Sequence, residues 1–177
     1  MLTSFVRCTV IAGLLALAAC ATAQPPAAVG HDAPKASFAL ADGGNLRLDG
    51  TRGDVVVLAF FTTYCPTSRA TLRAVDNLRA RNTAGGLRVI AVNEGDTTSR
   101  VDDLTGNLGV RLAVAFDKDG VAARELGLVT VPSIVVIDRQ GTVRHVHAGY
   151  HGEDDRTAIE GEVAALLLQT ASPTNAD

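Results

Sequence analysis

The sequence has 177 residues, of which 47% are hydrophobic and 20% are charged. That length suits one domain with a core of ordinary size, and the composition is typical of a globular chain rather than a disordered one. The net charge is -3 at pH 7. The chain therefore lacks the excess of basic residues that would indicate binding to nucleic acid, and we expect no nucleic-acid partner.

The N-terminus has the pattern of an export signal. Residues 10–19 (VIAGLLALAA) are wholly apolar, follow a short segment with one arginine, and end at Cys20. Such a run is short for a membrane span but suits a signal-peptide core. LAAC resembles the bacterial lipobox, in which the cysteine becomes the lipid-bearing first residue. We therefore predict lipidation of Cys20 and a membrane anchor there; ordinary cleavage near residues 21–23 is the alternative. Lipidation and ordinary cleavage would both place the domain in the cell envelope, outside the cytoplasm.

The expected organisation has four parts. They are a signal peptide of the lipoprotein type over residues 1–19, a flexible Ala/Pro-rich tether over 20–32, a folded domain over 33–170 and a disordered tail over 171–177. Cys8 is removed with the signal and Cys20 lies at the anchor or in the tether, so Cys65 is the only thiol of the folded part. A lone thiol in an exported protein indicates reactivity or intermolecular pairing.

The domain is predicted to open with a hairpin, since residues 37–40 and 45–48 flank the turn sequence DGG. The run VVVLAFF over 55–61 predicts a central strand covered on both faces. A helix follows from Pro66 and is expected to end at Gly85-Gly86; its apolar residues recur every three positions, at Leu72, Val75 and Leu78.

Strands and helices continue to alternate through the rest of the chain. Strands are predicted over 87–92, 111–116, 131–137 and 142–147, and helices over 98–108, 121–126 and 156–168. This order predicts an α/β fold, with a mixed sheet and helices on both faces.

Cys65 lies where the central strand gives way to the helix. A thiol at a helix N-terminus faces unpaired backbone N–H groups and the positive end of the helix dipole. Both favour the thiolate, which is the nucleophilic form, so we expect a lowered pKa. The alternative is a cysteine that serves as a small buried hydrophobe. Tyr64 and Pro66 beside it are more typical of an exposed turn.

Two segments carry a resemblance to a known family. VVVLAFFTTYCPTSR resembles the VVLNFWATWCPPCR pattern of thioredoxin-like proteins of the TlpA/ResA type, within the AhpC/TSA-redoxin-like group. ARELGLVTVPSIVVIDRQGTVRHVHAG is similar to the stretch around that family's cis-proline. The resemblance covers residues 33–169. It implies a thioredoxin fold with an N-terminal hairpin, thiol–disulfide chemistry without a cofactor, and protein or small-molecule thiols and disulfides as partners.

The resemblance also implies a partner-binding edge. A cis Val131–Pro132 bond would turn the backbone of Val131 toward an extended partner peptide; a trans proline at the start of a strand is the alternative. Gly149 matches a glycine of the family's substrate groove. The predicted partner-binding residues are Tyr64, Pro66, Val131, Pro132 and Gly149.

The chain departs from the family at its reactive motif. Ser68 stands in place of the resolving cysteine, Tyr64 in place of a tryptophan, Ala59 in place of an asparagine and Thr71 in place of a glutamate. A serine forms no disulfide but can hydrogen-bond a thiolate. Since the two-step cycle needs a second thiolate, we predict monothiol exchange with Cys65 as nucleophile and Ser68 as its thiolate partner.

Two other functions stay open. TTYCPT partly resembles the peroxiredoxin motif, with Thr62 three residues before the cysteine, but that family's proline is Leu58 here and Arg69 is the candidate for its arginine. The third hypothesis is a binding module that keeps the peptide groove and has lost catalysis.

The histidines offer a further candidate site. His145 and His147 lie two residues apart on a predicted strand, so their side chains share one face. Together with Cys65, these side chains could bind copper or zinc. An exposed edge strand without metal is the expectation. His151 is alternatively placed to approach Cys65 and support its thiolate. The segment EGD over 94–96 is interpreted as a surface loop.

Overall fold

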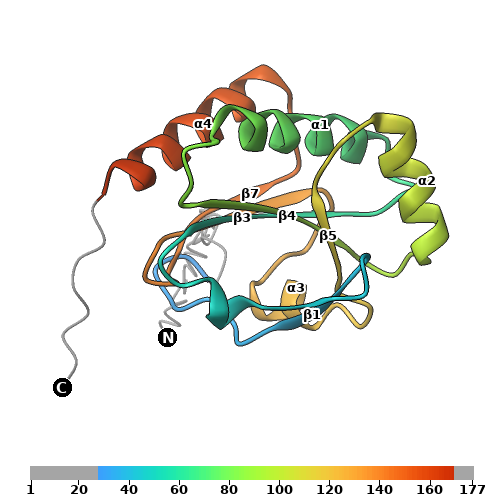
Figure 1. Ribbon diagram of the computed structural model, residues 1–177, viewed down its shortest axis with the longest axis horizontal. Coiled ribbons are helices and arrows are strands. Elements are labelled where there is room, and N and C mark those ends of the chain that lie inside the picture. The colour runs from blue at the N-terminus through green and yellow to red at the C-terminus, as the bar shows by residue number, and fades with distance from the viewer. Residues whose placement is uncertain (1–27, 170–177) are drawn as a thin grey trace, which may run out of the picture.

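A seven-stranded mixed sheet forms the centre of the computed structural model, which describes residues 28–169 (Figure 1). The strand order is β2-β1-β5-β4-β3-β6-β7. The strands are β1 (Ser37–Leu40), β2 (Asn45–Arg47), β3 (Val55–Phe61), β4 (Leu87–Asn93), β5 (Ala113–Phe116), β6 (Ser133–Ile137) and β7 (Val143–Ala148). The helices are the 3-10 turn η1 (Leu48–Thr51), α1 (Pro66–Arg81), α2 (Thr98–Leu108), α3 (Val121–Glu125) and α4 (Glu153–Leu168).

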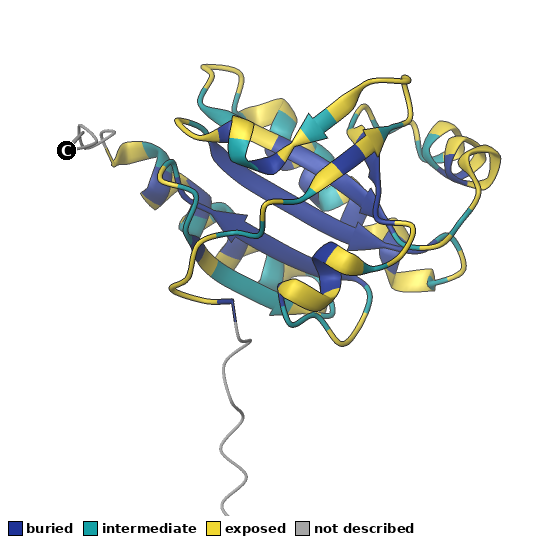
Figure 2. Cartoon of the chain, turned by 90° about the horizontal axis from the view of Figure 1, so that it is seen from below, coloured by how far each residue is buried: buried dark blue, intermediate teal, exposed yellow. Residues whose placement is uncertain are grey.

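The predicted central strand is confirmed as β3. It pairs in parallel with β4 and antiparallel with β6, and all of its residues are buried. A strand covered on both faces needs an apolar side chain at every position, which is what VVVLAFF supplies. In Figure 2, which views the sheet from below, the central strands are dark blue, whereas the exposed residues, in yellow, lie on the surrounding helices and loops.

Side chains of β3 alternate between two cores because successive residues of a strand point to opposite faces. Val57 and Ala59 pack against α1 and α4, whereas Leu58 and Phe60 pack against α3 and β1. Figure 1 shows α1 and α4 together on one side of the sheet and α3 on the other. The α/β prediction, with helices on both faces, is therefore confirmed.

Helix α1 begins at Pro66 and buries Leu72, Val75 and Leu78, as predicted. It ends at Arg81 rather than at the two glycines, so the predicted end was wrong. Asn82 explains the early stop: its side-chain amide donates to Leu78 O at 2.8 Å and its backbone N–H donates to Arg79 O at 3.2 Å. These bonds satisfy carbonyls that a continuing helix would otherwise use.

Four other element starts also differ from the prediction. Strand β5 begins at Ala113 rather than at 111, and β7 at Val143 rather than at 142. Helix α4 begins at Glu153, three residues before the expected start, and its first turn holds three acidic residues; carboxylates there are favoured by the helix dipole. Strand β6 begins at Ser133 rather than at 131. Pro132 has no N–H to give to a sheet ladder, which accounts for the later start.

The packed part of the chain begins by Ala28, within the range that the sequence assigns to the tether. Ala28 is buried, Gly30 N donates to Val143 O at 2.8 Å, and Val143 N donates to His31 O at 2.9 Å. The start at residue 33 was therefore too late. The predicted signal peptide, Cys20 and the tail over 171–177 lie outside the described residues. Within 28–169, no helix is both long and apolar enough to cross a membrane.

Candidate functional site

Cys65 is the N-cap residue of α1, at the end of the short turn that leads out of β3. Its side chain is partly exposed, and Tyr64 next to it is 76% exposed. Ser68 N donates to Cys65 O at 3.1 Å, which closes the first turn of the helix. The thiol thus lies at an accessible helix start and is not a buried hydrophobe.

Thr67 is the main influence on the Cys65 thiol. Its Oγ1 lies 3.2 Å from Sγ, and either atom can be the donor. A hydrogen bond from this hydroxyl lowers the pKa of Cys65, partial burial opposes the shift, and the Ser68 side chain and the N–H groups of Ser68 and Thr67 add to the lowering. The sulfur makes no capping hydrogen bond of regular geometry, so these N–H groups act over a longer distance. The direction of this pKa shift agrees with the one expected from the sequence.

Ser68 occupies the position of the missing second cysteine. Its side chain is fully buried, and its Oγ has no hydrogen-bond partner of regular geometry among the described residues. It nevertheless lies close enough to lower the pKa of Cys65, ranking behind Thr67. Its role as a thiolate partner remains a prediction, and on geometry Thr67 is the stronger partner.

The Val131–Pro132 loop lies against the thiol. The peptide bond is cis, as the resemblance implies, and Cys65 Sγ lies 3.6 Å from Val131 O. A neutral thiol can donate to that carbonyl, whereas a thiolate cannot. Gly149 N donates to Pro132 O at 2.8 Å. Strand β7 therefore ends beside this loop, and three of the predicted partner-binding residues meet at one edge of the sheet.

The remaining departures from the family fill the interior. Ala59 and Thr71 are both fully buried. Thr71 Oγ1 donates to Thr67 O within α1 at 3.1 Å. A hydroxyl held in this way on its own helix does not replace a titrating carboxylate, so proton transfer at Cys65 has no side-chain carrier at position 71.

The histidines bind carboxylates of α4. His145 Nδ1 lies 3.2 Å and His147 Nε2 2.7 Å from the carboxylate of Glu162, and both rings are partly buried. His151 Nδ1 lies 3.1 Å from Asp155 Oδ2. Strand β7 lies at the edge of the sheet, as predicted, but the His145 and His147 side chains are only 39% and 20% exposed, because Glu162 of α4 lies against both. Residues 28–169 contain no group of three or more ligands arranged for a metal ion.

Sequence reasoning missed Thr67 as a site residue. The sequence does offer one sign of this contact. Thr67 carries a hydroxyl two residues after the N-cap cysteine, in the first helical turn, where side chains form capping contacts. The segment over 94–96, predicted as a surface loop, also contacts the turn that carries Cys65. Thr63 N and Oγ1 each donate to the carboxylate of Asp96 at 2.7 Å.

The fold, with a cysteine at the start of a helix that follows a central strand, is that of the thioredoxin-like class of proteins. Residues 29–146 match the model of the AhpC/TSA family, and the chain belongs to that family. A crystal structure of a protein from Chlorobium tepidum, described as a thiol:disulfide interchange protein of the thioredoxin family, superposes with a TM-score of 0.67 at 20% identity, over 83% of this chain and 99% of that one. The thioredoxin fold is thereby confirmed.

Individual relatives refine the comparison. The chain is 34% identical over 100 residues to the thiol:disulfide interchange protein DsbE of Escherichia coli K12, over 56% of this chain and 52% of that protein. It is 25% identical over 134 residues to the thiol-disulfide oxidoreductase ResA of Geobacillus thermodenitrificans, over 76% and 77%. A Chlorobium tepidum structure provisionally named DsbE superposes with a TM-score of 0.72 at 29% identity, over 77% and 95%. The chain spans about half the length of the DsbE relatives that it matches.

Proposed function

We propose that this protein is an exported monothiol exchange protein in which Cys65 is the nucleophile. The observation that carries the proposal is the accessible Cys65 sulfur at the start of α1, 3.2 Å from the Thr67 hydroxyl, with a lowered pKa. A lowered pKa increases the thiolate fraction near neutral pH, and the thiolate is the form that attacks disulfides. The names of the DsbE and ResA relatives support the same chemistry.

The proposed step joins Cys65 to one half of a partner disulfide. The thiolate attacks one sulfur of the partner, a Cys65–partner disulfide forms, the partner's own disulfide breaks, and its electron pair leaves with the second sulfur as a thiolate. Ser68 cannot displace the bound half. A thiol from a second molecule, or another thiol of the same client, must complete the exchange, so the mixed disulfide is predicted to be long-lived.

The partners are proposed to be protein or small-molecule thiols and disulfides. An extended partner would lie along Val131, Pro132 and Gly149, with Tyr64 and Pro66 at the rim. The lipobox pattern supports an anchor at Cys20 and a location facing the periplasm or cell exterior. The proposed arrangement retains a signal peptide over 1–19 and a short tether to a domain that begins by Ala28.

Mass spectrometry of the intact chain over residues 21–177, which contains one thiol, tests the proposal. Incubation with oxidised glutathione under mildly alkaline conditions should add one glutathione per chain. Cys65→Ser is the control and should gain none. A wild-type chain that stays unmodified under conditions where a free-cysteine peptide reacts would contradict the proposed exchange.

The binding-module alternative makes a different prediction. If the peptide groove alone carries function, a client peptide should bind the Cys65→Ala variant as tightly as it binds the wild type. Loss of capture in that variant supports exchange.

The peroxidase alternative has less support from the structure. Arg69 is exposed, and among the described residues no hydrogen bond or ion pair joins it to Cys65. The Thr62 hydroxyl is buried and without a hydrogen-bond partner there. Peroxide consumption with a thiol donor, lost in Thr62→Val, would favour this alternative over exchange.

A further inference from the structure

A carboxylate from another loop holds the turn that carries Cys65. Asp96 lies in the segment between β4 and α2, and Thr63 lies two residues before the cysteine. Thr63 N donates to Asp96 Oδ2 and Thr63 Oγ1 donates to Asp96 Oδ1, both at 2.7 Å. Two short bonds to one carboxylate fix both the position and the orientation of Thr63.

Asp96 is itself held from behind. Asn93, the last residue of β4, is fully buried. Its Nδ2 donates to Asp96 Oδ2 at 2.9 Å and to Phe61 O at 3.3 Å, and its Oδ1 accepts from Asp96 N at 3.0 Å. The carboxylate therefore connects the ends of β3 and β4 to the turn between β3 and α1.

We propose that Asp96 is a positioning residue for Cys65, acting through Thr63 to hold the N-cap sulfur against Thr67 and the first N–H groups of α1. The inference rests on the proposed use of Cys65 as a nucleophile and adds a residue to it. Geometry at a helix start matters because the favourable field of the N–H groups falls off within the first turn. A turn released from Asp96 would let the sulfur leave that position.

The protonation state of Asp96 suits this role. Burial acts to raise its pKa, but hydrogen bonds from Asn93 and from the N–H and hydroxyl of Thr63, with the charge of Arg100, lower it overall. The group is therefore an acceptor-only carboxylate at neutral pH. Glu94 in the same segment has a raised pKa, from burial and from the charge of Asp117.

The charge of Asp96 and its positioning role have opposite effects on the thiol. A negative charge nearby disfavours a thiolate, so if charge were the only influence, its removal would lower the pKa of Cys65. Loss of positioning would raise that pKa instead. The direction of the change therefore separates the two roles.

The experiment compares Asp96→Asn, Thr63→Val and the double variant in the chain over residues 21–177. The rate of Cys65 alkylation by iodoacetamide is measured against pH, with thermal unfolding in parallel. Each single variant should move the midpoint of the rate profile upward and slow alkylation at pH 7 by about tenfold, because below the midpoint a rise of about one pKa unit reduces the thiolate fraction that much. The double variant should be no slower than the slower single variant, because both changes break one connection. Asp103→Asn, an exposed acidic residue of α2, is the control.

Three results would overturn the inference. They are a midpoint that falls or stays unchanged in Asp96→Asn, slowing that adds up in full in the double variant, and lower thermal stability without any change in the rate profile. Thr63→Val keeps the carboxylate, so it tests the connection even if Asp96→Asn does not fold. Addition of glutathione to the wild type is measured separately. If it fails while the rate profiles shift, exchange is contradicted and the positioning role is not.

Discussion

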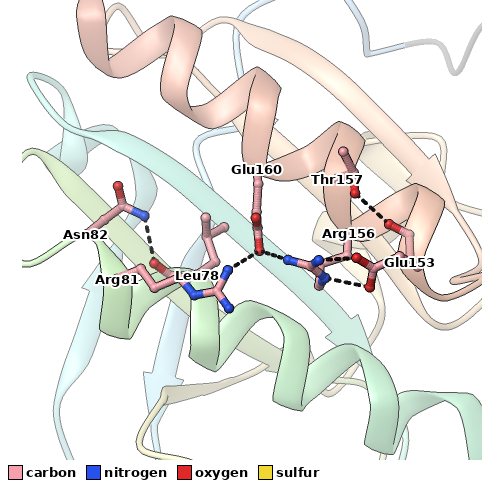
Figure 3. A network of polar contacts seen from close by, with 7 residues as sticks. All are labelled: Leu78, Arg81, Asn82, Glu153, Arg156, Thr157 and Glu160. Carbon is pink, nitrogen blue, oxygen red and sulfur yellow. Dashed lines mark hydrogen bonds and ion pairs between the residues drawn. The ribbon is translucent and has the colours of Figure 1, made fainter.

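Two regions of the molecule use polar contacts with different consequences. Between α1 and α4, Glu160 accepts from Arg156 at 2.6 Å and from Arg81 at 3.1 Å, and Arg156 also pairs with Glu153 (Figure 3). At the C-terminal end of β3, hydrogen bonds join the turn around Cys65 to Asp96 and the Cys65 sulfur to Thr67 and Val131. The first region has the larger number of charges, but the second contains the reactive group.

The effect of a polar contact depends on the chemical group that it touches. Glu160 and Arg156 are 29% and 28% exposed at their side chains and Arg81 is 63% exposed, so water and salt screen their attraction. The Thr67 hydroxyl is neutral, yet it lies against a thiol whose two protonation states differ in reactivity. One hydrogen bond there changes chemistry, whereas several ion pairs on the helices change only a small part of the free energy of unfolding.

The largest expected effect comes from restoring the second thiol. Ser68→Cys should release bound glutathione from Cys65 by internal attack, on the order of a hundredfold faster than in the wild type or more, because an internal thiol acts at a high effective concentration. The decay of the purified adduct is followed by intact mass without added thiol. Thr71→Cys is the control, since it adds a buried thiol to the same helix about one turn further from Cys65. Equal adduct lifetimes in the Ser68→Cys variant and the wild type would refute the assignment of Ser68 as the missing resolving position.

A smaller effect is expected at Thr67. Thr67→Val removes the hydroxyl 3.2 Å from Sγ and keeps the side-chain shape, so the pKa of Cys65 should rise and alkylation at pH 7 should slow by about three- to tenfold. The alkylation rate against pH is the measurement. Thr157→Val is a matched control in the first turns of α4, where the hydroxyl donates to Glu153 O at 2.9 Å; its alkylation profile should match that of the wild type. A Thr67→Val profile identical to the wild type would show that the Ser68 side chain and the backbone N–H groups set the pKa of Cys65 without the Thr67 hydroxyl.

The smallest effect belongs to the ion pairs. Glu160→Gln removes the shared carboxylate between the two arginines and should lower the free energy of unfolding by less than about 1 kcal/mol, because exposed pairs are screened. Urea unfolding at low and high salt measures this, and the difference from the wild type should shrink as salt rises. Alkylation of Cys65 should be unchanged. A loss of several kcal/mol, or a slower thiol, would mean that the two regions are coupled and not independent.

The sequence predicts local features best where one residue type has few alternatives. The run over 55–61 is apolar at every position, so β3 was predicted with its bounds, and Pro66 marked the start of α1. The end of α1 depends on the Asn82 side chain turning back onto Leu78 O, which periodicity does not show. The cover of His145 and His147 by Glu162 depends on how α4 packs against β7. The connection from Asp96 to Thr63 spans 33 positions, and spacing along the chain gives no sign of it.

Titration of the Cys65 thiol is the direct test of an activated nucleophile at the start of α1. Thiolate absorbance of the chain over residues 21–177 is followed against pH in the folded state and in denaturant, with Cys65→Ser subtracted to remove the tyrosine signal. We predict a lower midpoint for the folded chain than for the unfolded one. By linkage, the thiolate then stabilises the fold above the unfolded midpoint, and this stabilisation is lost as pH falls through the folded one. A folded midpoint equal to or above the unfolded midpoint would contradict an activated nucleophile at Cys65.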